Sequence, residues 1–441
     1  MKRCFCVLFV LIVVFVTAVS ASALDYGCNV STVSKSVYLE NLDTGAVIYD
    51  KYSGKQMYPA STTKIMTYIV TAENVSDLEN TYVTINDSVF ADIDPESTVM
   101  GLSEHVGEQV SVLDLLYGMM LPSGNDAALV LADYIGGGSI SNFVDMMNSK
   151  AAELGCTDTH FANPHGLHDP NHYTTAYDMA KIAKCAMNEP MLMQITSTVY
   201  YTPTGFETDL HNTNYMLDEN YHRGEYYYPN VKGIKTGFTD EAGRCLVTTA
   251  EKDGFTYLCV ALGADYSYED DINYAMKDTA NLYDWVFENL SQQVVYGPND
   301  MVKSIPVKYA SKGQEVALVP EKEVYALLPK DYDKSLLKTI VTGEESVDAP
   351  VTKGQALGSV SVSYGDMDLG SVNIVAAEDI ERDTFNYMVS RVGEFLKHNF
   401  IWIILGGAAL ITLIITISAL RSSAAKKRRE RERARNRRRY R

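Results

Sequence analysis

The chain has 441 residues, enough for one large domain and at least one smaller unit. Its formal charge of −18 is uneven, because the segment 24–420 carries 24 Lys/Arg against 54 Asp/Glu, about −30 by formal count. Such an acidic surface argues against nucleic acid or anionic lipid as partners of that segment.

The N-terminus has the pattern of a secretory signal peptide. Met1–Arg3 is basic, Cys4–Val19 is apolar, and Ala21–Ala23 is a run of small residues that suits cleavage after Ala23. The alternative is an uncleaved N-terminal anchor, although the apolar run is short for a membrane span. Either interpretation takes the following segment out of the cytoplasm.

The first half of the chain reads as a hairpin followed by helices. Two apolar stretches, Val37–Glu40 and Ala46–Tyr49, flank Asp43–Gly45, whose Asp and Gly favour a tight turn. Helical spacing then predicts five helices, several of which end at Gly or Pro: Ser61–Asn74, Val112–Leu121, Asp126–Ile135, Asn142–Leu154 and Thr174–Asn188.

Strand patterns return after the helices. They are rich in β-branched residues and cover Gly233–Thr236, Arg244–Ala250 and Thr256–Gly263, with a further helix at Ala275–Leu290. Strands at both ends of a helical middle predict an α+β domain in which one antiparallel sheet has helices clustered against it.

The last third changes character twice. Short alternating segments between Val295 and Ala377 predict a small all-β domain. Apolar residues then recur at helical spacing from Phe385 to Leu396, as in an amphipathic or stalk helix. Phe400–Leu420 has 21 residues without a charge, which reach roughly 32 Å as a helix and predict a transmembrane span rather than a buried core helix.

The tail Arg421–Arg441 has 12 Lys/Arg against 2 Glu, so the positive-inside rule places it in the cytoplasm. We therefore expect a single-pass cell-membrane protein whose large α+β domain faces the extracytoplasmic side. The predicted limits are 1–23 signal peptide, 24–292 large α+β domain, 293–378 small β domain, 379–399 amphipathic stalk, 400–420 transmembrane helix and 421–441 basic tail.

A hydroxyl and an amine share one face of the first predicted helix. Ser61 and Lys64 are three residues apart, so a lysine whose charge is disfavoured can take the serine proton. The helix N-terminus favours the developing negative charge. By itself the pattern is weak, because a capping serine with a solvated lysine is common.

Two further motifs strengthen this interpretation. Ser123-Gly124-Asn125 falls between two predicted helices, where a serine can relay a proton and an amide can hold a peptide. Lys235-Thr236-Gly237 falls on a predicted strand, where a cation and a hydroxyl can bind a carboxylate and glycine permits close approach. The alternatives are an ordinary turn and an ordinary strand end, but all three motifs occur in order and in suitable elements.

With these motifs the chain resembles the penicillin-recognising serine enzymes, and among them the D-alanyl-D-alanine carboxypeptidases of low molecular mass. The segments Ala162–Leu167, Tyr173–Ala180 and Thr236–Gly243 also resemble that family, as does Ala349–Gln355 in the small β domain. The resemblance runs from about Val33 to Ala377.

The resemblance implies a reaction and a role for each site residue. Ser61 would attack the carbonyl between the terminal D-alanines of a peptidoglycan stem peptide, with Lys64 as general base and Ser123 as the proton relay. Asn125, Lys235, Thr236 and Gly237 would bind substrate, and the N–H groups of Ser61 and Phe238 would bind the oxyanion. No metal or other cofactor is needed, and β-lactam antibiotics would be covalent inhibitors.

Three other functions stay open at this point. A D,D-endopeptidase would use the same machinery. A class A-like β-lactamase is disfavoured by Ser-Gly-Asn in place of Ser-Asp-Asn and by the absence of Glu between Glu153 and Glu189. A wall-binding scaffold protein would not need Ser61.

Histidines and cysteines offer weaker signals. His165, His168 and His172 match no zinc spacing, and we expect His165 near the site and the other two at the surface. Five cysteines remain after the signal peptide, of which Cys245 and Cys259 flank a predicted hairpin and suggest cross-strand neighbours. The sequence leaves their disulfide status open.

Overall fold

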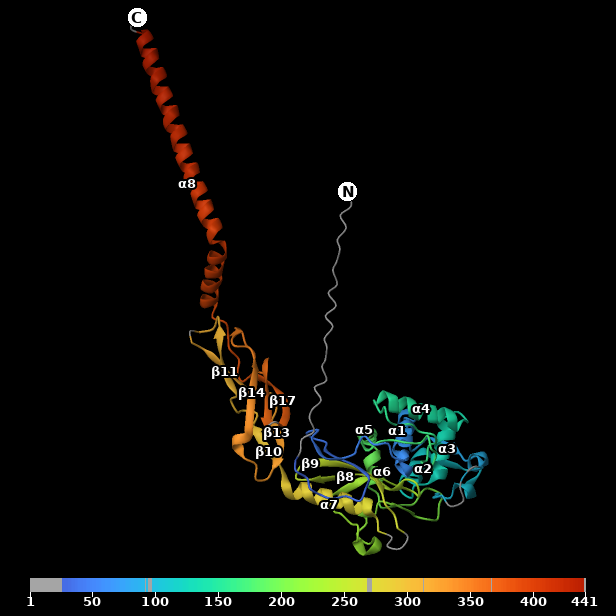
Figure 1. Cartoon of the computed structure of the whole chain (residues 1–441). Coiled ribbons are helices and arrows are strands. Elements are labelled where there is room, and N and C mark those ends of the chain that lie inside the picture. Colours follow the sequence, from blue (N-terminus) through green and yellow to red (C-terminus); the bar gives the residue numbers. More distant parts are fainter. Residues whose placement is uncertain are drawn as a thin grey trace. The chain divides into compact units, whose positions relative to one another are not determined.

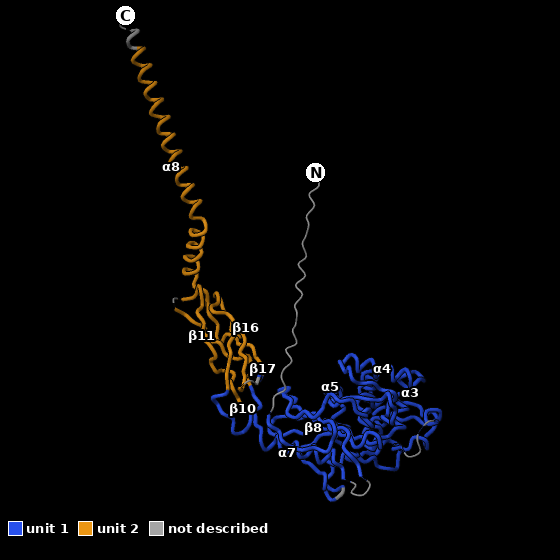
Figure 2. The backbone as a smooth tube through the Cα atoms, in the orientation of Figure 1, with its two compact units in different colours: residues 1–293, 325–336, 366–369 blue, residues 294–324, 337–365, 370–441 orange. Residues whose placement is uncertain are grey.

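The computed structural model describes residues 26–91, 93, 97–267, 272–311, 313–365 and 367–439. The predicted signal peptide lies outside the described residues. The chain forms two compact units (Figures 1 and 2), the first made of residues 1–293, 325–336 and 366–369, and the second of residues 294–324, 337–365 and 370–441. The domain limits derived from the sequence stay a prediction.

A five-stranded antiparallel sheet forms the centre of the first unit. Its order is β2-β1-β9-β8-β7, with β1 at Ser36–Asn41, β2 at Val47–Lys51, β7 at Val231–Thr239, β8 at Gly243–Lys252 and β9 at Phe255–Ala264. The predicted first hairpin forms β1 and β2. Strand β7 lies at an edge of this sheet, so one side of its backbone has no neighbouring strand within it.

Both faces of the sheet are buried, and β9 shows why. From Tyr257 to Leu262 its residues alternate: Leu258, Val260 and Leu262 join a core shared with the first six α-helices, whereas Tyr257, Cys259 and Ala261 join a core shared with α7 (Tyr274–Asn289). Alternate side chains of a strand point to opposite faces. The first unit is therefore a helix-sheet-helix sandwich, and the predicted α+β class is confirmed.

The helices fall close to the predicted positions. They are α1 at Lys64–Asn74, α2 at Val112–Met120, α3 at Asn125–Ile135, α4 at Ile140–Glu153, α5 at Ala176–Met187 and α6 at Leu192–Thr196. Helices α2, α4 and α5 each begin after a Ser or Thr whose side chain accepts an N–H from the first turn. The five-residue helix α6 was not predicted, because it is too short for its periodicity to show.

The expectation for Cys245 and Cys259 is wrong. Cys259 pairs with Thr248 of β8, and Cys245 belongs to the core on the other face of the sheet. Neighbouring strands bring two cysteines together only where their side chains leave the same face. Both residues carry free thiols.

The second unit contains a six-stranded sheet with order β14-β16-β17-β12-β11-β15. The strands are β11 at Lys303–Lys308, β12 at Glu315–Pro320, β14 at Leu337–Gly343, β15 at Val347–Asp348, β16 at Ala356–Tyr364 and β17 at Met367–Ala376. Strands β10 (Leu290–Tyr296) and β13 (Val324–Pro329) form a separate two-stranded sheet, of which residues 290–293 and 325–329 are assigned to the first unit. The predicted small β domain is confirmed.

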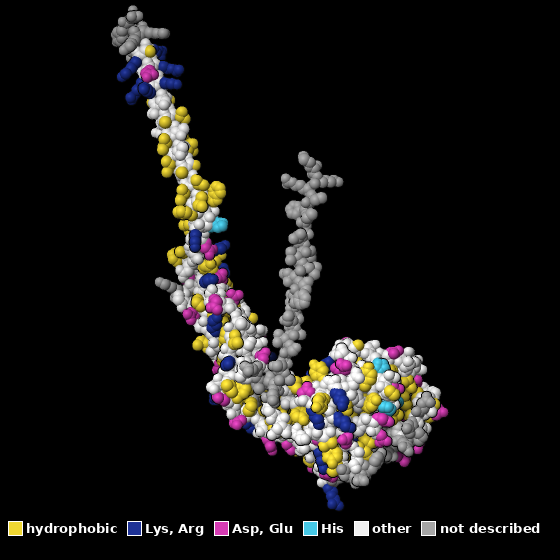
Figure 3. Space-filling model, in the orientation of Figure 1, with side chains coloured by type: hydrophobic (Ala, Val, Ile, Leu, Met, Phe, Trp, Pro, Cys, Tyr) yellow, Lys and Arg dark blue, Asp and Glu magenta, His cyan; other side chains and the backbone are white. Residues whose placement is uncertain are grey.

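One continuous helix, α8 (Thr384–Arg439), contains the predicted span and most of the predicted stalk and tail, although the stalk was predicted to begin at residue 379, five residues before the helix. It is the one described helix long and apolar enough to cross a membrane on its own, and that window is not buried by protein. Figure 3 shows hydrophobic side chains along its middle and a gathering of Lys and Arg beyond them. The segment contains no proline, so nothing in its backbone interrupts the helix between stalk and span.

Candidate active site

Ser61 lies on a tight turn that leads into α1. The 3-10 helix η1 (Ala60–Thr63) precedes α1, which begins only at Lys64. Thr62 Oγ1 donates to the carbonyl of Pro59 at 2.7 Å, and Thr63 Oγ1 donates to the carbonyl of Ala60 at 2.8 Å. The sequence placed Ser61 in the α-helix, but Ala60 has a φ of 47°, outside helical geometry.

The Lys64 side chain is buried, and three oxygen atoms lie within hydrogen-bonding distance of its amine nitrogen. Its Nζ lies 3.0 Å from Ser61 Oγ, 2.6 Å from Asn125 Oδ1 and 2.7 Å from the carbonyl oxygen of His165. The amide and backbone oxygens can only accept hydrogen bonds. A neutral amine has two N–H groups and one lone pair, so both donors are used there and the lone pair remains for the Ser61 hydroxyl.

Electrostatics favour this neutral amine. Burial lowers the pKa of Lys64 well below its usual range, the positive charge of Lys235 lowers it further, and Asp126 acts in the opposite direction. Lys235 is itself 1% exposed, and burial lowers its pKa to about 7. Burial thus disfavours the charged form of both lysines, and at Lys64 the nearby charge of Lys235 adds to this effect.

The second motif lies where α3 begins. Asn125 is the first residue of α3, and its backbone N–H donates to the carbonyl of Thr98 at 2.8 Å. Ser123, two residues earlier, has a φ of 69° and a buried Oγ with no hydrogen-bond partner among the described residues. Its carbonyl accepts from Thr98 Oγ1 at 2.9 Å. Strained backbone and an unpaired buried hydroxyl are typical of functional sites.

Asp126 supports this motif and was missed by the sequence analysis as a site residue. Its buried carboxylate accepts the backbone N–H groups of Met100, Gly101 and Leu102 at 2.9 to 3.0 Å. These bonds hold the loop that contains Thr98 against the N-terminus of α3. An acidic residue in a first helical turn was the available signal, but such residues are common without a loop to bind.

The third motif, on edge strand β7, lies next to Ser61. A Cβ added at Gly237 would lie 3.0 Å from the Ser61 nitrogen and 3.1 Å from the Pro59 oxygen, so only glycine fits without displacement. Thr236 Oγ1 lies 2.6 Å from Thr213 Oγ1. Phe238 is 38% exposed and packs edge to face against Tyr266, with ring centroids 4.8 Å apart.

Two of the three histidines belong to the site region, which corrects one expectation. His168 is exposed, as expected, and lies edge-on to the Tyr58 ring. His172 is only 1% exposed, because the loop that carries it folds back under η1 and Thr63 contacts its ring at 2.7 Å. Burial lowers the pKa of His165 to about 3 and that of His172 to about 4.

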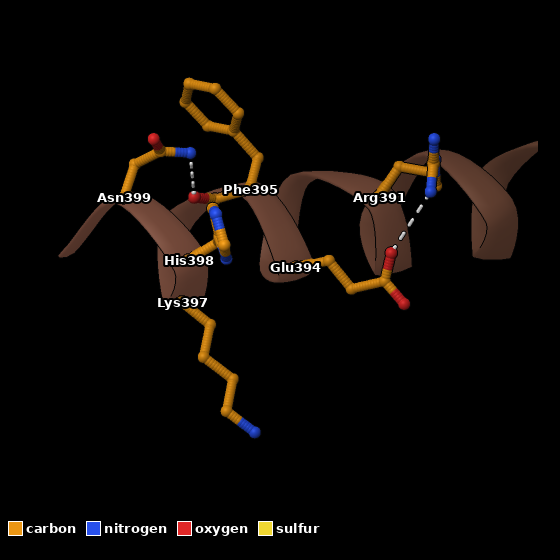
Figure 4. A pocket seen from close by; sticks show the side chains of 6 residues that line it. All are labelled: Arg391, Glu394, Phe395, Lys397, His398 and Asn399. Carbon is orange, nitrogen blue, oxygen red and sulfur yellow. Dashed lines mark hydrogen bonds and ion pairs between the residues drawn. The ribbon is translucent and has the colours of Figure 1, made fainter. Parts of the chain in front are cut away.

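The hollow drawn in Figure 4 is not a candidate site. It lies on one exposed stretch of α8, where Arg391 and Glu394 form an ion pair at 3.3 Å and no second element brings convergent groups. Among the described residues, no three ligand-type side chains gather as a metal site. The catalytic candidate is therefore the convergence of η1, α3 and β7.

Two family models match the chain, one for each unit. Residues 21–266 match the D-alanyl-D-alanine carboxypeptidase model, Peptidase_S11, and residues 291–382 match the model of the C-terminal domain of penicillin-binding protein 5. The first match covers more than half of the chain.

Similar proteins extend over nearly the same length. D-alanyl-D-alanine carboxypeptidase DacF of Bacillus subtilis is 32% identical over 408 residues, which cover 90% of this chain and 100% of the relative. The crystal structure of penicillin-binding protein 5 from Haemophilus influenzae has a TM-score of 0.63 at 30% identity, covering 80% of this chain and 98% of that one. PBP3 of Streptococcus pneumoniae, titled a peptidoglycan synthesis regulatory factor, has a TM-score of 0.66 at 25% identity, covering 80% and 100%.

Proposed function

Because the chain belongs to the D-alanyl-D-alanine carboxypeptidase family of serine-type, penicillin-binding hydrolases, we propose that Ser61 is its nucleophile and Lys64 the base that activates it. The reaction is removal of the terminal D-alanine from peptidoglycan stem pentapeptides. The observation that carries the assignment is the 3.0 Å contact between Lys64 Nζ and Ser61 Oγ, made by an amine whose other two contacts are acceptors.

Acylation follows from this geometry. Lys64 accepts the Ser61 proton while Ser61 Oγ attacks the carbonyl between the two D-alanines. The oxyanion is bound by the backbone N–H groups of Ser61 and Phe238, which the close approach of Gly237 to Ser61 supports. The carbon-nitrogen bond then breaks, Ser123 passes the proton to the leaving amine, and D-alanine departs.

Substrate binding uses the remaining residues of the three motifs. Lys235 and Thr236 hold the terminal carboxylate, whose negative charge restores the charged form of Lys235. The substrate backbone pairs with the open edge of β7 and with the Asn125 amide. Water hydrolyses the acyl-enzyme and releases the shortened peptide.

The cellular setting is part of the same proposal. The apolar part of α8 anchors the protein in the cell membrane, with its basic end in the cytoplasm and the catalytic domain on the extracytoplasmic side. There it meets peptidoglycan stem peptides as substrates, and β-lactam antibiotics acylate Ser61 as analogues of the terminal dipeptide.

A paired assay tests the assignment. Purified protein is incubated with a fluorescent penicillin and, separately, with a pentapeptide ending in D-Ala-D-Ala. We expect a stable label on a peptide containing Ser61, and stoichiometric D-alanine release. Ser61→Ala abolishes both, whereas Ser88→Ala, a change at an exposed serine, leaves both intact.

The same assay separates the alternatives. Rapid penicillin turnover without D-alanine release would identify a β-lactamase. Cleavage of cross-linked dimers in preference to pentapeptide would identify a D,D-endopeptidase. A label on any residue other than Ser61 would overturn the assigned nucleophile.

A further inference from the structure

The peptide unit between Ala60 and Ser61 has two functional ends. Its N–H belongs to Ser61 and is one of the two proposed oxyanion donors. Its carbonyl belongs to Ala60 and points to the opposite side, because this bond is not among the cis peptides of the described residues. A peptide unit is planar, so whatever fixes the carbonyl also fixes the direction of the N–H.

A relay of three hydrogen bonds ends on the carbonyl of Ala60. The backbone N–H of Ala162 donates to His172 Nδ1 at 3.1 Å. His172 Nε2 lies 2.7 Å from Thr63 Oγ1, and Thr63 Oγ1 donates to the Ala60 carbonyl at 2.8 Å. Both side chains of this relay are buried, with His172 at 1% and Thr63 at 0% exposure.

The direction of every hydrogen bond in this relay is determined by the two backbone groups at its ends, the N–H of Ala162 and the carbonyl of Ala60. A backbone N–H can only donate, so Nδ1 accepts and the ring proton of neutral His172 is on Nε2. The Thr63 hydroxyl gives its single proton to the Ala60 carbonyl, so it must accept from Nε2. One tautomer of one histidine therefore sets the orientation of the whole relay.

We propose that His172 is a positioning residue for catalysis: through Thr63 it aims and polarises the Ala60–Ser61 peptide, so that the Ser61 N–H is directed at the oxyanion. Hydrogen bonding at a carbonyl strengthens the N–H at the other end of the same peptide unit. The relay thus acts on the transition state, where negative charge develops, more than on the bound substrate.

Steric contacts hold the same peptide from another side. A Cβ added at Gly166 would lie 1.9 Å from the Ala60 oxygen and 2.9 Å from the Ser61 nitrogen. Gly166 and His172 belong to one loop, which also supplies the His165 carbonyl to Lys64. The loop 162–172 therefore orients both the proposed general base and the proposed oxyanion donor.

The groups that surround His172 keep it in the required form. Burial is the main reason that its pKa is lowered to about 4; Lys64, His160 and His168 add repulsion, and Asp169 acts in the opposite direction. Protonation would place an N–H on Nδ1, facing the N–H of Ala162, and would break the first bond of the relay.

Two neutral substitutions separate the two ends of the ring. In His172→Gln the amide N–H lies where Nε2–H was and can still donate to Thr63. In His172→Asn the amide oxygen lies where Nδ1 was and keeps the Ala162 bond but not the Thr63 bond.

A second pair of variants tests the hydroxyl of the relay. Thr63→Ser keeps the hydroxyl, and Thr63→Val removes it at nearly constant volume. His168→Gln, at an exposed position of the same loop, is the matched control.

The inference rests on the proposed function, and the readouts distinguish the two. In purified full-length protein we measure the rate of Ser61 acylation by a fluorescent penicillin, kcat and KM for D-alanine release, and affinity for a boronic acid analogue of the tetrahedral intermediate. We expect kcat and boronate affinity to fall together, on the order of 10- to 100-fold in His172→Asn and Thr63→Val, with KM unchanged. His172→Gln, Thr63→Ser and the control stay within a few fold of wild type.

Each other outcome has a defined meaning. Equal losses in His172→Asn and His172→Gln, or wild-type rates in Thr63→Val, would overturn the relay while leaving the proposed function in place. A change in KM without a change in boronate affinity would do the same. Failure of the wild type itself to acylate at Ser61 would remove the proposed function, and the relay with it.

Discussion

At the scale of single residues, the site depends on the balance of charge between two buried lysines. In the proposed mechanism Lys64 must be neutral to accept a proton, and Lys235 must be charged to hold a carboxylate, yet burial disfavours the charged form of both. The two lysines differ in their partners: the N–H groups of Lys64 already donate to neutral acceptors, whereas Lys235 is proposed to bind a substrate anion. One low-dielectric pocket can therefore serve as the site of both proposed roles.

The first prediction concerns the pH dependence of acylation. Replacing Lys235 by Gln removes a positive charge that lowers the pKa of Lys64. The pKa of Lys64 therefore rises, and the acidic limb of the pH profile for acylation by a penicillin moves to higher pH, together with a fall in the maximal rate. Lys232→Gln, at an exposed position of the same strand, is the control and leaves the profile in place. An unchanged acidic limb in Lys235→Gln would contradict the coupling.

The second prediction concerns stability, and its sign follows from two buried neutral histidines. The pKa of His172 is lowered from 6.5 to about 4 and that of His165 to about 3, so the unfolded chain binds protons that the folded chain does not. Their contribution is complete above about pH 6.5 and is lost as the pH falls toward 4. For His172 alone the loss between pH 7 and 5 is about 2 kcal/mol.

Urea unfolding of the wild type and of His172→Gln at pH 7 and pH 5 measures this contribution. The variant is expected to lose less stability between the two pH values than the wild type. Equal slopes would show that His172 is not held neutral by the fold.

At the scale of elements, the site is the meeting point of a turn, a helix start and an edge strand. The tight turn η1 exposes Ser61, α3 begins at Asn125, and β7 brings a glycine against the turn. Each element would form with other residues at these positions. The three elements can lie close together because the residues where they meet have small side chains or hydroxyl groups that hydrogen-bond to the backbone.

The third prediction tests that approach at Gly237. Gly237→Ala puts a Cβ at 3.0 Å from the Ser61 nitrogen and 3.1 Å from the Ala60 Cβ, so β7 and η1 must separate by a few tenths of an ångström. We expect acylation to slow on the order of 10- to 100-fold, because a small displacement of an oxyanion donor is costly. The change is measured as the second-order rate constant with a fluorescent penicillin.

Gly54→Ala is the matched control, because a Cβ there has no neighbour within 4 Å. A wild-type acylation rate in Gly237→Ala would mean that β7 can move away from η1 without cost. The contact between β7 and η1 would then not determine the geometry of the proposed oxyanion site.

At the scale of the whole molecule, the residues proposed for catalysis and the apolar helix proposed as the anchor belong to separate units. All the residues proposed for catalysis lie between Ser61 and Phe238, in the first unit, whereas the apolar helix α8 belongs to the second. The first turn of α8 is tied to the β domain, since Asn386 Nδ2 donates to the Ala310 carbonyl at 3.1 Å and Tyr387 packs edge to face on Tyr309. Most of the described side chains of α8 beyond Tyr387 are exposed.

The fourth prediction is a truncation after Ser390, which keeps these contacts and removes the span. The shortened protein, expressed with a cleavable export signal, is expected in the soluble fraction, whereas the full chain is expected in membranes. Its acylation rate with a fluorescent penicillin stays within about twofold of the full chain in detergent, because no proposed catalytic group is removed. Retention of the truncated protein in membranes would point to a second anchor.

The sequence predicted the fold well where the information is local. The hairpin of β1 and β2, the longer helices of the first unit and the small β domain all follow from periodicity and turn residues. The prediction failed at η1, where backbone carbonyls accept hydrogen bonds from threonine hydroxyls. It also failed for the two cysteines, because the register of the strands decides which face of the sheet each side chain occupies. It also missed α6, which is too short to show a period.

By itself, then, the sequence determined the order of the three motifs, the apolar helix and the sheet, because these are patterns among neighbours in the chain. Only the tertiary structure decided that Lys64 is buried against Asn125 and His165, which are 61 and 101 positions away, and that the His172 ring lies 2.7 Å from the hydroxyl of Thr63, 109 positions away. Protonation and tautomer depend on which groups are close in space, and burial, rather than residue type, makes those contacts strong enough to matter.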